Sequence, residues 1–146
     1  MTTPVVRLAQ LRDAQDIRRI NRDALGYDYP QQETIARLKM ILNSPYNCIW
    51  VMDTPSGVVG YIHASDYDTT YGPSQKNIMA LAVDPSAQGM GYGRMLIQAA
   101  EAWAKQSGAQ GMRLISGHDR VGAHAFYRAC GYTMRKEQKN FVKALD

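Results

Sequence analysis

Three glycines and an arginine stand between a short apolar run and an amphipathic pattern, and their spacing is suited to holding an anion. The glycines are at positions 89, 91 and 93, and Arg94 follows them. The first turn of a helix leaves backbone N–H groups unpaired and carries about half a positive charge. Glycine lets a phosphate approach those groups because it has no Cβ. The stretch therefore predicts a phosphate-binding turn that opens a helix.

The spacing of the glycines separates this stretch from two other phosphate loops. The run Q-G-M-G-Y-G is neither the G-x-G-x-x-G of dinucleotide folds nor the G-x-x-x-x-G-K-[ST] of nucleoside triphosphatases. It matches Q/R-x-x-G-x-G, and with the preceding A-L-A-V-D-P and the following R-M-L-I it resembles the pyrophosphate loop of the GNAT superfamily of acetyl-CoA-dependent N-acetyltransferases. The alternative is a glycine-rich connection that only tightens a turn between strand and helix.

The resemblance implies how acetyl-CoA binds. Backbone groups of Leu81 and Val83 would pair with the pantetheine arm as an added strand does, in a splay between the fourth and fifth strands. The N–H of Leu81 would polarise the thioester carbonyl. The cofactor-binding residues expected from the family pattern are Leu81, Ala82, Val83, Gln88, Gly89, Met90, Gly91, Tyr92, Gly93, Arg94 and Arg120.

A second motif contains a tyrosine. The run A-H-A-F-Y-R-A-C-G-Y resembles the family's A-x-x-F/L-Y-x-x-x-G-F/Y, which carries the catalytic tyrosine onto Tyr127. A phenol with a pKa of about 10 can protonate a thiolate whose conjugate acid has a pKa of about 8.5. The alternative is an ordinary core tyrosine on a short helix. Many family members have Asn seven residues before this tyrosine; here that residue is Arg120, so its contact with the cofactor is open.

The sequence lacks the acidic residue that serves as general base on the fourth strand of several family members. Several family members carry Glu on the fourth strand, whereas Gln75 to Val83 contains no acid. An alkyl amine with a pKa of about 10.4 is protonated at neutral pH, so a base or a proton relay is expected. The candidates for the base are His63, Asp66, Asp68, His118 and Asp119, and the candidates for the acceptor site are His63, Asp66, Tyr67, Asp68 and His118. A structural role for His63, and amine binding by the two aspartates, are open alternatives.

The apolar periodicity predicts an α/β fold that positions these residues. Strands are expected at 5–8, 48–53, 58–67, 78–83, 112–116 and 140–145, and helices at 13–24, 30–43, 91–107 and 122–130. The order β-α-α-β-β-β-α-β-α-β is that of the GNAT fold. We expect a mixed, mostly antiparallel sheet with helices on both faces, in a single N-acetyltransferase domain over residues 1–146.

Composition excludes several other classes of protein. The 146 residues are 45% hydrophobic with a net charge of +4, and no long block of like charges suggests a nucleic-acid arm. No signal peptide or membrane-length apolar run is evident, and two cysteines fit a reducing cytoplasm. The three histidines show no ligand spacing, so no metal is expected. The expected partner is a small-molecule or peptide amine, without nucleic acid or membrane, and a homodimer is left open.

The sequence thus predicts an N-acetyltransferase that moves the acetyl group of acetyl-CoA directly onto a primary amine, with Tyr127 as general acid. One alternative is a non-catalytic acyl-CoA-binding sensor or structural subunit of the same fold, which the missing glutamate keeps open. A Rossmann-type nucleotide-binding module is disfavoured because it needs its glycines after the first strand. The sequence does not identify the acceptor.

Overall fold

The computed structural model describes residues 3–146 and contains two compact units. The first unit ends at Leu114, and the second runs from Ile115 to Asp146. All five strands of the sheet lie in the first unit. The single domain over residues 1–146 remains a prediction.

The first unit alternates strands and helices much as the periodicity predicts. Its strands are β1 (Val5–Leu8), β2 (Asn47–Thr54), β3 (Gly57–Tyr67), β4 (Gln75–Val83) and β5 (Gly111–Leu114). Its helices are α1 (Ala14–Ile20), α2 (Gln31–Leu42) and α3 (Tyr92–Gln106), with short turns of helix η1 (Leu11–Asp13), η2 (Asn21–Leu25) and η3 (Pro85–Ala87). The sheet order is β1-β2-β3-β4-β5; the pairs up to β3–β4 are antiparallel, and β4–β5 is parallel.

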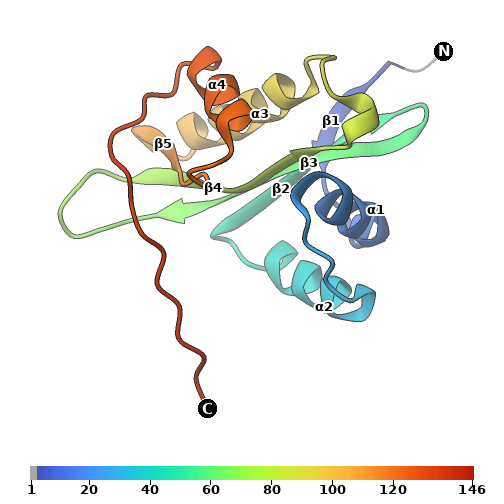
Figure 1. Ribbon diagram of the computed structural model, residues 1–146, viewed down its shortest axis with the longest axis horizontal. Helices are drawn as coiled ribbons and strands as arrows, with labels where there is room; N and C mark the ends of the chain where they lie inside the picture. Colours follow the sequence, from blue (N-terminus) through green and yellow to red (C-terminus); the bar gives the residue numbers. More distant parts are fainter. Residues whose placement is uncertain (1–2) are drawn as a thin grey trace. The chain divides into compact units, whose positions relative to one another are not determined.

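Helices cover both faces of this sheet (Figure 1). Ile17 and Ile20 of α1 share a buried cluster with Val51 of β2 and Tyr61 of β3. Leu96 of α3 approaches the backbone on the other face, where its Cδ1 lies 3.4 Å from the place that a Cβ on Gly60 would take. Because adjacent residues of a strand point to opposite faces, Gly60 and Tyr61 mark the two faces of β3.

Helix α3 begins and ends at glycines, as its sequence predicts. Gly91 is its N-cap with φ +83°, and Gly108 follows its C-cap with φ +80°. Between them Leu96, Ala100 and Ala104 recur at helical spacing and are buried against the sheet. Burial of this stripe, rather than intrinsic propensity, holds a helix of this length in place.

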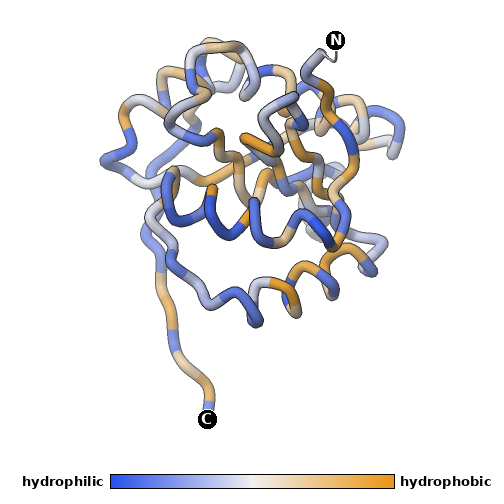
Figure 2. Tube along the Cα trace, turned by 90° about the vertical axis from the view of Figure 1, so that its right-hand side faces the viewer, coloured by the Kyte–Doolittle hydropathy of each residue, from blue (hydrophilic) through white to orange (hydrophobic). Residues whose placement is uncertain are grey.

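The second unit contains α4 (Val121–Ala129), which ends before Gly131 with φ +93°. The predicted strand at 140–145 is wrong, because residues 133–146 form neither helix nor strand. Figure 2 shows apolar residues along this terminal segment, and Phe141 is 88% exposed. An apolar, β-favouring run becomes a strand only where a neighbouring strand supplies hydrogen bonds and burial, and this run has neither.

Candidate active site

Strand β4 parts from β5 halfway along its length. The pairing joins Gln75–Ile78 to Gly111–Leu114, and Ile78 with Leu114 is the last pair. Beyond this pair, Ala80 to Val83 of β4 pair with β3, with a register shift at Met79. On the other side, Met79 to Val83 pair with no strand in the described part of the chain. The two strands therefore leave an open strand edge that runs toward the glycine loop.

Alternation along β4 decides which backbone groups face the open edge. The N–H of Asp84 donates to the carbonyl of Val59 over 2.7 Å. The backbone N–H of Asp84 and the backbone groups of Ala82 therefore point toward β3. The N–H and C=O of Leu81 and Val83 then point toward the open side. The carbonyl of Val83 accepts a hydrogen bond from Nε2 of Gln88, 3.0 Å away. An extended ligand could pair with these groups, displacing the Gln88 side chain from the Val83 carbonyl.

The loop after β4 leads directly into α3. Asp84 turns the chain by accepting hydrogen bonds from Ser86, and Gly89 and Gly91 follow with φ of +83° each. A Cβ added at either glycine would meet no atom within 4 Å. The glycines are therefore required by the left-handed backbone and leave space in front of the first N–H groups of a 15-residue helix.

Two of the predicted acceptor-side residues already have partners within the first unit. Nε2 of His63 lies 2.8 Å from Oδ1 of Asn47, and burial lowers the pKa of His63 to about 4. Asp66 forms an ion pair with Lys76 over 2.5 Å, and Lys76 is buried with its Nζ 4.3 Å from the centroid of the Trp103 ring. His63 is thus neutral at neutral pH, and the charge of Asp66 is balanced beneath α3.

Tyr127 lies on α4, within the second unit. Its ring makes edge contacts with Phe126 and Tyr132, at centroid distances of 5.4 and 6.0 Å. Burial raises the pKa of Tyr127, and the charge of Arg120 opposes this in part. The phenol therefore holds its proton at neutral pH, as a general acid must. Arg120 is the N-cap residue of α4.

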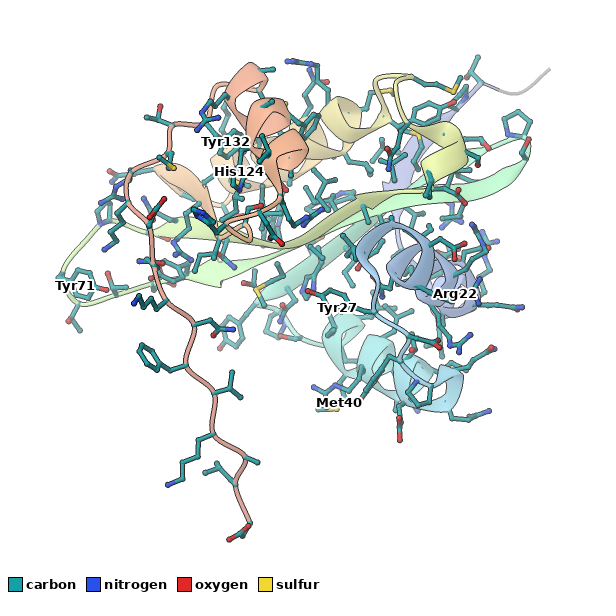
Figure 3. All side chains as sticks on the ribbon, in the orientation of Figure 1. Arg22, Tyr27, Met40, Tyr71, His124 and Tyr132 are labelled. Carbon is teal, nitrogen blue, oxygen red and sulfur yellow. The ribbon has the colours of Figure 1, made fainter. Side chains whose placement is uncertain are left out.

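Two histidines of the second unit have partners there. His124 projects from α4 (Figure 3). Its Nε2 lies 2.8 Å from the carbonyl of Gly117. The exposed His118 has Nδ1 3.6 Å from a carboxylate oxygen of Glu137. His118 and Asp119 remain candidates for the general base, and His118 also remains a prediction for the acceptor site.

Comparison with known proteins decides the family. The family model described as Acetyltransferase (GNAT) family matches residues 14–132. This chain belongs to the GNAT acetyltransferase family. The match begins at α1 and ends just after α4, so it includes the open edge of β4, the glycine loop and the tyrosine motif.

Individual relatives of this GNAT chain include aminoglycoside acetyltransferases. It is 42% identical over 50 residues to aminoglycoside N(6')-acetyltransferase type 1 of Stenotrophomonas maltophilia, a match over 34% of this chain and about a third (33%) of that protein. The aminoglycoside 6'-N-acetyltransferase AAC(6')-IG of Acinetobacter haemolyticus has a TM-score of 0.83 at 19% identity, covering 97% of this chain and 99% of that one. AAC(6')-Iy, solved with CoA, has a TM-score of 0.87 at 15% identity, covering 99% and 97%. At these identities the structural likeness shows the fold.

Residues 3–146 of the GNAT chain contain no group of three or more metal-ligating side chains. In the same part of the chain, no helix is long and apolar enough to cross a membrane.

Sequence reasoning missed several polar residues of the GNAT sheet. Lys76 neutralises Asp66, and Arg113 of β5 bonds to Asn77 of β4. Alternation within G-M-R-L places Arg113 opposite Asn77 once the parallel register is known, but sequence does not give that register. The signal in the sequence that could have pointed to this pair was a single arginine within a short, otherwise apolar strand.

The buried His63 predicts a loss of stability of this GNAT chain in acid. Its pKa is about 4 when folded and about 6.5 when unfolded, so the unfolded chain takes up the proton first as the pH falls. The free energy of unfolding should decrease from pH 6.5 to 4, by up to about 3 kcal/mol, and this contribution should level off below pH 4. His63→Gln should flatten that decrease in urea titrations at several pH values, while His118→Gln at the exposed site should not. An unchanged slope in His63→Gln would show that other groups cause the acid loss.

Proposed function

We propose that this GNAT chain is an N-acetyltransferase that moves the acetyl group of acetyl-CoA directly onto a primary amine. The observation that carries the proposal is the open edge of β4, which is followed, after the short turn η3, by a left-handed glycine turn at the N-terminus of α3. An added strand-like ligand with a phosphate at one end fits this combination. That is the shape of a pantetheine arm joined to a pyrophosphate.

The backbone supplies most of the proposed acetyl-CoA contacts. The carbonyl of Leu81 and the N–H and carbonyl of Val83 pair with the pantetheine amides, which leaves the N–H of Leu81 for the thioester oxygen. The side-chain amide of Gln88, which now donates to the carbonyl of Val83, gives way to the pantetheine N–H. The N–H groups from Gln88 to Arg94 hold the pyrophosphate, and the helix dipole of α3 adds to their attraction.

Binding both substrates side by side supplies much of the proposed catalysis. The amine nitrogen forms a bond to the acetyl carbon, and the C–S bond then breaks. The N–H of Leu81 stabilises the oxygen that becomes negative, and Tyr127 gives its proton to the departing thiolate. The nitrogen that has attacked loses its extra proton to water, and water returns a proton to the Tyr127 phenolate. With a pKa of about 4, His63 is a poor acceptor for the proton of an alkylammonium ion, so we propose that water carries it away.

The relatives named as aminoglycoside N-acetyltransferases support a small molecule as the acceptor. We also propose a homodimer, because Phe141, Val142 and Leu145 are each almost fully exposed. The free thiol of Cys48 is compatible with the proposed cytoplasmic location. The absence of an acid on β4 favours a second candidate, a subunit that binds acyl-CoA without turning it over.

Thiol release from acetyl-CoA, measured with a panel of primary amines, separates the two candidates. The enzyme should release thiol at a rate that saturates in amine and in acetyl-CoA. A binding subunit should show acetyl-CoA affinity by calorimetry and no release above the rate without protein. Absence of acetyl-CoA binding would contradict both candidates.

A further inference from the structure

Three neighbouring strands contribute a polar cluster to one face of the sheet. It consists of Tyr67 on β3, Asn77 on β4 and Arg113 on β5, which we call the guanidinium cluster. Nη1 of Arg113 donates to Oδ1 of Asn77 over 2.5 Å. The guanidinium carbon lies 4.1 Å from the centroid of the Tyr67 ring. Stacking and a hydrogen bond thus hold the guanidinium in a defined position above the sheet.

The position of the cluster relates it to the proposed reaction. Asn77 and Arg113 form the register pair just before Ile78 and Leu114, where β4 and β5 separate. Alternation along β3 places Tyr67 on the same face as Tyr61 and His63, which is the face opposite α3. The glycine turn opens α3 on the other face. An acceptor that approaches the origin of the open edge from the face opposite α3 therefore passes Arg113.

The charge of Arg113 is not balanced by an acid. Within residues 3–146, no carboxylate forms an ion pair with Arg113, and both of its contacts are neutral side chains. Asp66 lies on β3, two strands away from β5, and is already neutralised by the buried Lys76. A guanidinium carries several N–H donors in a planar fork that matches carboxylate and phosphate oxygens, and the structure uses one of them.

We propose that Arg113 binds an anionic group of the acceptor, either a carboxylate or a phosphate. This inference rests on the proposed function. The acceptor class is then a primary amine that also carries an acid group, rather than a polycation. A molecule with several ammonium groups would meet an uncompensated positive charge where the acid group belongs. The proposal thus assigns this chain an acceptor chemistry that differs from the aminoglycosides named for its relatives.

Three amines with the same two-methylene spacer test the proposal: 3-aminopropanoate, 2-aminoethylphosphonate and 3-aminopropanamide. Thiol release gives kcat/KM for each amine, and calorimetry in the presence of CoA gives each Kd without relying on turnover. The wild type should prefer the better anion over the amide by about tenfold or more, the range of a hydrogen bond between charged groups. A larger ratio for the carboxylate or for the phosphonate identifies which source of the anion fits the cluster.

Variants connect the preference to Arg113. Arg113→Gln should reduce the ratio to near one and raise kcat/KM for a polyamine, whereas Arg113→Lys should retain part of the ratio. Arg37→Gln, which removes the same charge from the exposed surface of α2, should leave the ratio unchanged. If Arg113→Gln does not fold, the wild-type ratio should still shrink as the salt concentration rises.

The outcomes separate this proposal from the proposed function. Thiol release without an anion preference, or a preference that survives in folded Arg113→Gln, overturns the role of Arg113 and leaves the acetyltransferase in place. Binding of the anionic amines that depends on Arg113, without thiol release from any amine, supports the anion site and overturns the acetyltransferase. Equal Kd values for all three amines contradict the anion site whether or not turnover occurs.

Discussion

Replacing Tyr127 by phenylalanine is expected to lower kcat by about 10²–10⁴-fold, the usual contribution of a general acid. The affinity for acetyl-CoA should stay nearly unchanged, because a proton transfer stabilises the transition state rather than the bound ground state. The ring contacts with Phe126 and Tyr132 do not need the hydroxyl group, so the fold should persist. Burial raises the pKa of Tyr127, which keeps the acid form present over the neutral range.

Single-turnover thiol release measures the chemical step, and calorimetry with a melting curve reports binding and folding. Tyr132→Phe is the matched control, since it removes a hydroxyl from a neighbouring ring of the same unit. A single-turnover rate of Tyr127→Phe within about threefold of wild type is well below the range for an acid catalyst and would remove Tyr127 from the mechanism. Loss of cofactor affinity at an unchanged rate would make it a binding contact instead.

Replacing Gly91 by aspartate should weaken acetyl-CoA binding by roughly tenfold to a hundredfold. Gly91 is the N-cap of α3, and its missing Cβ leaves open space before the first N–H groups. An aspartate there places a carboxylate where the phosphate would lie. This carboxylate accepts hydrogen bonds from the N–H groups that would otherwise bind the phosphate. The reduced affinity should appear as a higher Kd in calorimetry and a higher KM for acetyl-CoA.

Backbone strain is the competing explanation for such a loss, since a φ of +83° disfavours any side chain. Gly108 provides the control, because it has a φ of +80°, open space at its Cβ position and a place at the other end of α3. Gly108→Asp should lower the melting temperature comparably or more and leave the Kd for acetyl-CoA near the wild-type value. Equal weakening in both variants would assign the loss to strain, and normal affinity in folded Gly91→Asp would contradict the loop as phosphate site.

Local pattern was sufficient to predict most of the fold. The i, i+3, i+4, i+7 spacing of Leu96, Ala99, Ala100 and Trp103 and the flanking glycines defined α3 to within a residue or two, because both signals are local in the sequence. The terminal strand failed for the opposite reason. Phe141 and Val142 have a strand-like composition, but strand formation depends on a partner that composition does not provide.

The candidate site divides in the same way. The left-handed glycines of the loop follow from their residue types, and the open backbone of Leu81 and Val83 follows from the strand order that the family resemblance implied. The partners of charged residues did not follow, because Asp66 with Lys76 and Asn77 with Arg113 meet across strands whose register is a tertiary property. Sequence therefore predicted the backbone conformation of the glycine loop better than the partners of the charged residues.

The most direct test of acetyl transfer follows both products in one reaction. Wild-type protein, acetyl-CoA and a primary amine that gives thiol release should produce free CoA thiol and the N-acetylated amine in equal amounts, the latter measured by mass spectrometry. Without the amine, the intact mass of the protein should show no acetyl group, because the proposed transfer is direct. Thiol release that is independent of the amine, or an acetylated protein that forms first and passes its acetyl group on, would contradict direct transfer from acetyl-CoA to the amine.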